Sequence, residues 1–248
     1  MININFEFGL RSGEEQLKPK SFARRVIIES DFYSFNPLYS SFIQSGVASD
    51  EYETLCIKKG EVLYFERFNR HGFYFIIEGL AKMELSHPAP QVIRLCRRGD
   101  MVGYGSWLVP KTESYRLIAL QDTTVQFWTK EASDSLQRKS TLVNKLLIEH
   151  LTQVILLKDE RIASLQGETV ENRVAHLLLW LAKNFGRQTV QGLLIDISLD
   201  RECMAQLAGT IPVTLARVLT YFEQEKIILR EKRKVLVLHI QELEKKTF

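Results

Sequence analysis

A segment near the C-terminus combines a helical apolar repeat with side chains that can form directed hydrogen bonds. Its apolar residues recur at i, i+3, i+4 and i+7, as in a helix with one buried face, and they are Leu215, Val218, Leu219 and Phe222. Thr214 and Arg217 lie largely off that face. An arginine guanidinium can donate two parallel hydrogen bonds to O6 and N7 of guanine, which discriminates against other bases by about 1–3 kcal/mol. The reading of base edges in DNA is therefore one chemistry open to this face.

A second short helix is predicted just before this one, separated from it by a tight turn. Gly209 ends the first helix, because glycine adopts the left-handed conformation without steric cost. Thr210 is placed to cap the second helix, and Pro212 suits its first turn, where a missing N–H does little harm. Helix, tight turn and helix is how many proteins present side chains to the major groove. An ordinary helical hairpin in a core gives the same pattern, so the segment alone leaves both interpretations open.

The composition indicates a globular protein large enough for two domains. The chain has 248 residues, of which 45% are hydrophobic and 25% charged, and its formal net charge is +3. With so small a net charge, binding to nucleic acid would depend on where the basic residues lie. No apolar run approaches the ~18–20 residues of a membrane span, and no secretory signal is evident. The three cysteines are far apart and odd in number, which favours a reducing cytoplasm and disfavours disulfides.

Changes of pattern along the chain indicate four parts of an α+β protein. Residues 1–50 have no sustained period and are expected to be a partly irregular N-terminal extension. Residues 51–130 contain seven or eight short β-type runs with glycines between them, which predicts an antiparallel β-roll of the jelly-roll kind. Residues 131–166 form a continuous helical pattern without proline or glycine. Residues 168–248 contain a helix over 170–184, the helix pair and a basic hairpin.

The long helix predicted over 131–166 carries more apolar residues than one buried face requires. A helix with two apolar faces packs on both of them. One face is expected to lie on the β-roll and the other on a second copy of the same helix, which would make the protein a homodimer. Packing of the second face against the other domain of the same chain is the alternative.

A β-roll, a long connecting helix and a C-terminal helix-turn-helix with a β-wing together resemble the Crp/Fnr family of bacterial transcription regulators. Two stretches carry the resemblance, which covers about residues 50–240: KKGEVLYFERFNRHGFYFIIEGLAKM and RECMAQLAGTIPVTLARVLTYFEQEKII. The first looks like the opening strands of the family's β-roll, and the second like its helix-turn-helix running into the wing. Within the family, NRVAHLLLWLAKNFGRQTVQGLLIDISLDRECMAQLAG is most similar to the cyanobacterial global nitrogen regulators and their plastid relatives.

The resemblance implies that residues 211–223 form the recognition helix of a winged helix-turn-helix domain. Arg217 matches the family's base-contacting arginine, Thr214 could touch a phosphate or a thymine methyl group, and Arg201 matches a phosphate-binding position. The other residues assigned to DNA contact are Thr210 and the basic residues of the wing, namely Lys226, Arg230, Lys232 and Arg233. A solvated hairpin is the alternative explanation for the charges of the wing.

The sequence departs from the family at the start of the recognition helix. Many members have an arginine and then a glutamate there, whereas this chain has Pro212 and Val213. The nitrogen regulators also have valine at the second place. The preferred DNA sequence is therefore expected to differ from that of other members, or to depend on fewer direct contacts, which gives Arg217 a larger share of the specificity.

The effector pocket implied by the resemblance lies in the β-roll and at the long helix. Its candidate residues are Gly103, Tyr104, Gly105, Ser114, Arg116 and Asp159. Tyr104 replaces the glutamate that takes the ribose hydroxyl in cyclic-nucleotide-binding members, and Glu113 and Ser114 stand where an Arg–Ser pair belongs. A carboxylate repels a phosphodiester, so cyclic AMP and cyclic GMP are not expected ligands.

A 2-oxoglutarate site, or another anion site, remains an alternative. Arg116 is one residue from the register that would bind a carboxylate, and Val154 replaces an arginine of the long helix. Four arginines could still build an anion site or could be structural, and they are Arg94, Arg97, Arg98 and Arg116.

The sequence offers no support for an enzyme, a metal site or a bound cofactor. Residues 1–50 contain no cysteine for an iron–sulfur cluster, and His71 and His87 lack the spacing of a metal site. The hypothesis is a homodimeric regulator that binds double-stranded DNA at a pseudo-palindromic operator and contacts RNA polymerase, with an unknown small-molecule effector. A ligand-binding scaffold whose helix-turn-helix contacts protein is the competing class.

Overall fold

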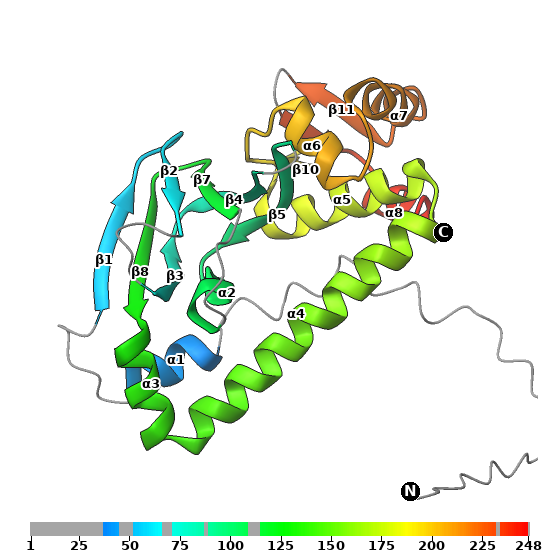
Figure 1. Cartoon of the computed structure of the whole chain (residues 1–248). Coiled ribbons are helices and arrows are strands. Elements are labelled where there is room, and N and C mark those ends of the chain that lie inside the picture. The colour runs from blue at the N-terminus through cyan, green and yellow to red at the C-terminus, as the bar shows by residue number, and fades with distance from the viewer. Residues whose placement is uncertain are drawn as a thin grey trace, which may run out of the picture.

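The computed structural model describes residues 37–44, 52–65, 71–86, 89–108, 115–231 and 234–247. A β-roll and a C-terminal helical domain lie at opposite ends of the molecule, and one long helix, α4 (Thr141–Gly167), runs along one side of it between the two (Figure 1). No single described helix is long and apolar enough to cross a membrane. Among the described helices, only α6 (Arg201–Leu207) and α7 (Pro212–Gln224), taken together as a pair bent by 89°, satisfy those criteria.

The β-roll consists of two antiparallel four-stranded sheets, in agreement with the predicted jelly roll. The first sheet has the order β1-β8-β3-β6 and the second β2-β7-β4-β5. The strands are β1 (Tyr52–Ile57), β2 (Val62–Tyr64), β3 (Gly72–Glu78), β4 (Leu80–Leu85), β5 (Gln91–Arg97), β6 (Met101–Val102), β7 (Tyr115–Ala119) and β8 (Thr123–Thr129). Each of the seven predicted runs contains a strand, and the two-residue β6 is additional. A short helix, α2 (Tyr104–Leu108), follows β6.

An aromatic cluster covers the outer face of the first sheet. The ring of Phe42 packs edge-on against those of Phe73, Phe75 and Trp128, with centroids 5.1–5.6 Å apart. Phe42 belongs to α1 (Pro37–Gln44), which lies within the predicted N-terminal extension and also contacts α4. This part of residues 1–50 is therefore an integral element of the core.

The prediction of one continuous helix over 131–166 is wrong. The structure has two helices, α3 (Lys130–Lys139) and α4 (Thr141–Gly167), separated at Ser140, whose backbone is extended. Oγ of Ser140 accepts a hydrogen bond from the N–H of Val143, and the N–H of Ser140 donates to the carbonyl oxygen of Leu136. The serine thus caps both helices. The second of these helices ends at Gly167.

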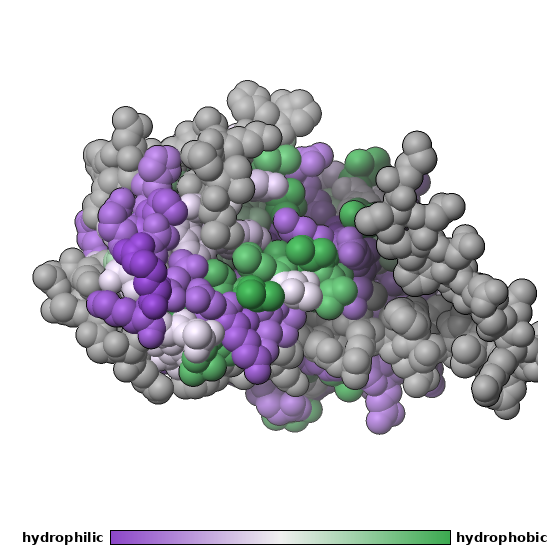
Figure 2. All heavy atoms as spheres, turned by 60° about the horizontal axis from the view of Figure 1, so that its bottom comes forward, coloured by the Kyte–Doolittle hydropathy of each residue, from purple (hydrophilic) through white to green (hydrophobic). Residues whose placement is uncertain are grey.

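The helix α4 has a buried face and an exposed apolar face. Val143, Leu147 and His150 are buried against the β-roll and its aromatic cluster. Ile148, Ile155 and Ile162, which we call the α4 stripe, are each more than half exposed and recur every seven residues. Figure 2 views the molecule from the side of α4 and shows hydrophobic side chains gathered at the centre of this face. The predicted second apolar face therefore exists and is uncovered in the single chain.

The C-terminal domain has the winged helix-turn-helix arrangement that the sequence predicts. Its elements are α5 (Val170–Phe185), β9 (Gly186–Gln188), β10 (Leu193–Ile195), α6 (Arg201–Leu207), α7 (Pro212–Gln224), β11 (Ile228–Glu231), β12 (Lys234–Val237) and α8 (Ile240–Lys245). The strands form one antiparallel sheet in the order β11-β12-β10-β9. The hairpin of β11 and β12 is the wing, and α8 is an element that the sequence pattern did not predict.

The two domains contact one another directly. The backbone N–H of Val92 in β5 donates to Oε1 of Gln206 in α6 at 2.7 Å. Leu80, Val92 and Leu95 of the β-roll belong to the same apolar cluster as the core of the C-terminal domain. The first helix of the helix-turn-helix thus rests on the β-roll, which fixes how the pair is presented.

Candidate nucleic-acid interface

The turn between α6 and α7 is a Schellman motif at Gly209, as the predicted break requires. Gly209 has φ of +64°, in the left-handed region. Its N–H donates to the carbonyl oxygen of Gln206 at 3.0 Å, and the N–H of Thr210 donates to that of Ala205 at 2.9 Å. This turn sets α6 and α7 at 89° to one another. The angle is that of a helix-turn-helix pair.

The prediction that Thr210 caps the second helix is wrong. The N-cap of α7 is Ile211, and its side chain makes no capping hydrogen bond. The physical reason is Pro212, which occupies the first helical position as predicted and keeps the residue before it extended. Thr210 is therefore one residue too early, and its N–H closes the Schellman turn instead.

The outer face of α7 carries exposed side chains, while the predicted apolar stripe is directed inward. Val213, Arg217 and Thr220 are exposed at i, i+4 and i+7, and Leu215, Leu219 and Phe222 are buried. An open groove of about 550 Å³ follows this face, lined by Arg201, Pro212, Val213, Ala216, Arg217, Thr220, Tyr221 and Gln224. Thr210 and Thr214 are half-buried.

Arg201 and Arg217 lie on the same groove from two different helices. Both are exposed, and neither forms an ion pair or a side-chain hydrogen bond with any residue in the described ranges. Arginines that the fold does not use internally retain all five N–H donors for another molecule. The structure therefore brings together two guanidinium groups that the sequence assigned to base and phosphate contact.

The basic residues of the wing are in part neutralised within the chain. Nε of Arg230 donates to Oε2 of Glu223 at 2.9 Å, and the pKa of Glu223 is lowered by this pair. Lys234 pairs with Asp196, whose pKa is also lowered. Lys226 is exposed and has φ of +57°. Lys232 and Arg233 lie outside the described residues.

A second groove, of about 730 Å³, separates the helix pair from the wing. Its lining includes the apolar Met204, Leu215 and Val235 and charged residues of both signs, namely Asp200, Arg201, Arg230 and Lys234.

Two arginines hold the helix-turn-helix against the rest of the protein. Arg173 in α5 is buried and donates from Nε to the carbonyl oxygen of Ala208 at 3.0 Å and from Nη2 to that of Gly209 at 3.1 Å. Nη2 of Arg161 in α4 donates to the carbonyl oxygen of Leu207 at 2.6 Å. The last carbonyls of a helix lack partners within it. The sequence analysis did not find these roles, and the only local signal was an arginine inside the apolar helix α5.

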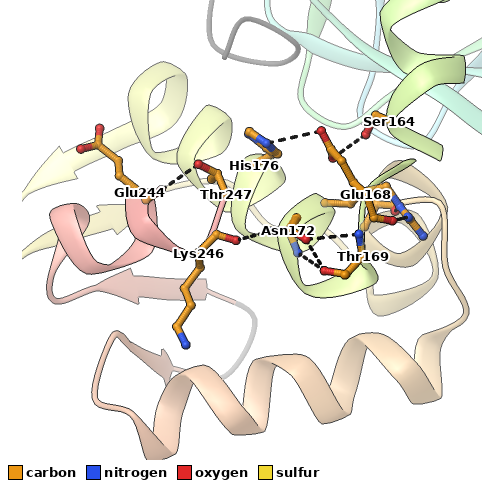
Figure 3. Close-up of polar contacts among 10 residues, drawn as sticks. Ser164, Glu168, Thr169, Asn172, His176, Glu244, Lys246 and Thr247 are labelled. Carbon is orange, nitrogen blue, oxygen red and sulfur yellow. Dashed lines mark hydrogen bonds and ion pairs between the residues drawn. The ribbon is translucent and has the colours of Figure 1, made fainter. Parts of the chain in front are cut away.

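The joint between α4 and α5 is a cluster of polar contacts that includes the end of the chain (Figure 3). Oε2 of Glu168 accepts from Oγ of Ser164 at 2.6 Å, and Nδ2 of Asn172 donates to the carbonyl oxygen of Lys246 at 3.0 Å. His176 lies 3.7 Å from Oε1 of Glu168 and is almost fully buried. Burial lowers the pKa of His176, and Glu168 opposes that shift.

Gly103 and Tyr104, both predicted for the effector pocket, lie at the junction of the β-roll and α4. Gly103 has φ of +76°, and a Cβ atom there would lie 3.2 Å from the ring of Phe65. Tyr104 and Gly105 open α2, and the ring centroid of Tyr104 is 6.4 Å from that of His150. Ser114 lies outside the described residues.

The two charged residues predicted for this pocket are placed differently. Nε of Arg116 donates to Oε1 of the buried Glu84 at 2.8 Å, and Nζ of Lys82 lies 3.3 Å from Oε2 of the same carboxylate. Asp159 is exposed on α4, nine residues beyond His150, which is about 13 Å along the helix axis. Of the other arginines considered for an anion site, Arg94 pairs with Asp100 at 3.2 Å.

His150 is a buried histidine that the sequence analysis did not single out. Its Nε2 is buried and has no hydrogen-bond partner in the described part of the chain. Burial lowers the pKa of His150 to about 4, and the charge of Arg94 acts in the same direction. The imidazole is therefore neutral near pH 7. Within the described ranges, no group of three or more His, Cys, Asp and Glu side chains could hold a metal ion.

Comparisons with known proteins agree with this architecture. A cyclic nucleotide-binding domain model matches residues 54–140 and a Crp-like helix-turn-helix domain model matches residues 172–246. The global nitrogen regulator of Synechococcus elongatus is 22% identical over 209 residues, covering 82% of this chain and 94% of that protein. The putative HTH-type transcriptional regulator ycf28 of Porphyra purpurea is 21% identical over 204 residues, covering 82% of this chain and 84% of its own.

A solved structure shares the fold. A Crp/Fnr family transcriptional regulator of Thermus thermophilus superposes with a TM-score of 0.66 at 21% identity, over 79% of this chain and 98% of its own. Neither matched domain model is that of a catalytic domain. The β-roll, the connecting helices and the winged helix-turn-helix occur here in the order of those regulators, and the chain belongs to the Crp/Fnr family of transcriptional regulators.

Proposed function

We propose that this regulator binds double-stranded DNA of a defined sequence through the outer face of α7. The observation that carries the proposal is the pair of exposed arginines on one groove, Arg201 and Arg217, neither of them paired with another described residue. Arg217 lies on the recognition helix and reads guanine from the major groove. Arg201 opens α6 and binds the phosphate backbone, which sets the position of α7 in the groove.

The wing adds phosphate contacts of unequal strength. Lys226 is exposed, whereas Arg230 and Lys234 are held by Glu223 and Asp196. Each phosphate neutralised releases counterions, so binding weakens as salt rises, with a slope of log K against log[salt] near −0.9 per phosphate contact. The paired residues of the wing contribute less to this slope than Arg201.

The functional unit is a homodimer that pairs along the α4 stripe. Ile148, Ile155 and Ile162 repeat every seven residues and are exposed in the single chain, as in one strand of a coiled coil. Two-fold symmetry then places two copies of α7 on a pseudo-palindromic operator, with half-sites about one helical turn (~10 bp) apart. Contact with RNA polymerase, expected from the family, would convert DNA binding into a change of transcription.

The β-roll of this chain does not bind cyclic AMP or cyclic GMP. A cyclic phosphate needs a guanidinium group that can turn toward it, and that of Arg116 is held by hydrogen bonds to Glu84. Tyr104 offers no carboxylate to a ribose hydroxyl. Titration calorimetry with both nucleotides should give no heat of binding, and micromolar binding of either would overturn this part of the proposal.

Selection from a random-sequence duplex library tests the DNA proposal. The protein should enrich one two-fold symmetric motif, and its affinity for that motif should fall steeply between 50 mM and 200 mM salt. Arg217→Ala should lose the sequence preference while the protein stays folded and dimeric. Arg138→Ala, which removes an exposed arginine of α3, is the matched control. A library that shows no enriched motif would overturn the proposal.

A further inference from the structure

We propose that the apolar start of α7, Ile211 and Val213, reads the 5-methyl group of thymine next to the guanine contacted by Arg217. The inference rests on the proposed function, because it concerns the same DNA interface. Contact with a thymine methyl group compensates for the absence of polar side chains at the start of the recognition helix.

The first observation is the exposure of two branched apolar side chains at this end of α7. Ile211 is 62% exposed and Val213 is 59% exposed. Ile211 occupies the N-cap and makes no capping hydrogen bond, although a Ser, Thr, Asp or Asn there would stabilise the helix by about 1 kcal/mol. Both side chains are therefore largely accessible in the single chain and available for contact with another molecule.

The second observation is the charge around these side chains. The groove along α7 is lined by Val213 together with Arg201 and Arg217, and none of its lining residues is acidic. Val213, whose two charged neighbours in this groove are both cations, complements the major groove, where phosphates border the base edges. A protein partner with an acidic, apolar surface is the competing occupant, and the experiment below separates the two.

Spacing relates the methyl contact to the guanine contact. Val213 and Arg217 are four residues apart on one helical face, so their Cβ atoms lie about 5–6 Å apart. Successive base pairs are about 3.4 Å apart along the duplex. The two side chains therefore contact bases that are no more than about two base pairs apart. Thymine is the natural base that presents a methyl group in the major groove, and apolar side chains recognise it there.

The experiment replaces single thymines by uracils in the duplex obtained from random-sequence selection. Uracil keeps the pairing and removes only the methyl group. Uracil should weaken binding about fourfold at each methyl contacted, the factor that corresponds to burial of one methyl-sized group. The sensitive positions should lie within about two base pairs of the guanine whose contact Arg217→Ala removes.

Variants assign the contact to its side chain. Val213→Ala and Ile211→Ala should each abolish the uracil effect at the methyl group that the shortened side chain contacts, and keep it at a methyl group contacted by the other side chain. Val190→Ala removes the same atoms from a fully exposed valine between β9 and β10 and should keep the full uracil effect.

The outcomes separate this inference from the proposed function. Tight binding to the selected duplex without any effect of uracil would overturn methyl readout and leave sequence-specific DNA binding intact. Weaker binding caused by uracil at one position, if it persists in both alanine variants, would also overturn methyl readout. If the random-sequence library yields no preferred duplex, the proposed function itself is overturned. Capture of an acidic protein by the exposed face of α7 would then identify a protein as the partner of this face.

Discussion

Nη2 of Arg161 in α4 lies 2.6 Å from the carbonyl oxygen of Leu207, the last residue of α6. This hydrogen bond joins the helix that carries the α4 stripe to the helix-turn-helix itself. A Cβ atom on Gly209 would lie only 2.3 Å from the side chain of Leu165, one turn further along α4. The last turns of α4 are therefore packed against the turn that orients α7.

Arg161→Ala should lower the free energy of unfolding of the C-terminal domain. A hydrogen bond from a charged donor is worth about 1.5–3 kcal/mol, and burial lowers the pKa of this arginine, so its donors are largely removed from water. Denaturant unfolding measures the loss. Arg138→Ala, at an exposed position, should change the same quantity by less than about 0.5 kcal/mol. Equal stability of the two variants would show that the hydrogen bond to Leu207 contributes nothing to the free energy of unfolding.

Gly209→Ala should destabilise the protein more than alanine at another glycine of positive φ. Gly60 has φ of +88° and open space around its Cα, so alanine there costs only backbone strain, about 1–2 kcal/mol. Alanine at Gly209, where φ is +64°, would in addition displace the terminal methyl group of Leu165, whose Cδ2 would lie 2.3 Å from the new Cβ atom. The double variant Gly209→Ala/Leu165→Ala should recover part of the extra loss in thermal unfolding temperature that Gly209→Ala shows relative to Gly60→Ala. Equal losses of stability from alanine at the two glycines would contradict the packing of α4 on the turn.

Ile155→Asp should convert the proposed dimer into a monomer. The substitution places a carboxylate in the middle of the α4 stripe, where a partner helix would bury it without a counter-charge. Sedimentation equilibrium measures the change. Ile93→Asp alters an exposed isoleucine of β5 and should leave the dimer intact. Persistence of the dimer in Ile155→Asp would place the interface elsewhere.

His150 should make the stability of the protein depend on pH between about 4 and 6.5. Burial lowers its pKa to about 4 in the folded chain from an ordinary 6.5, so the unfolded chain binds more protons in this range. Stability therefore falls as the pH is lowered through it, by about 3 kcal/mol in total, and the loss is complete below pH 4. Denaturant unfolding at pH 7 and pH 4 measures the fall.

His150→Leu should reduce this fall, since leucine cannot take up a proton. His176 shifts in the same direction and remains in both proteins, so the difference between them isolates His150. His239→Gln, at an exposed histidine, should behave like the unaltered protein. An equal fall in all three proteins would show that His150 is not the group that titrates.

The helix-turn-helix could be predicted because its signals are local. Gly209 marks a left-handed turn, Pro212 marks a first helical turn, and the apolar repeat that begins at Leu215 identifies the buried face. The β-type runs indicated the β-roll for the same reason. The break at Ser140 could not be predicted, because serine occurs both inside helices and at their caps, and no proline or glycine marks the site.

The contacts that support the site join residues that are far apart in the sequence, so a local pattern does not reveal them. Arg173 reaches residues 35 and 36 positions away, and Arg116 meets Glu84 across two strands. Such pairs depend on how the elements fold together, and one sequence does not reveal them. The same holds for Ile211, whose role as a cap follows from the backbone before Pro212 and not from its own side chain.

Guanine methylation interference on the selected duplex tests the central claim most directly. A methyl group on N7 of guanine blocks the hydrogen bonds of an arginine fork. The account predicts interference at one guanine in each of two symmetric half-sites, with centres about 10 bp apart, and loss of that interference in Arg217→Ala. Interference that is absent in the unaltered protein, or unchanged in Arg217→Ala, would contradict it.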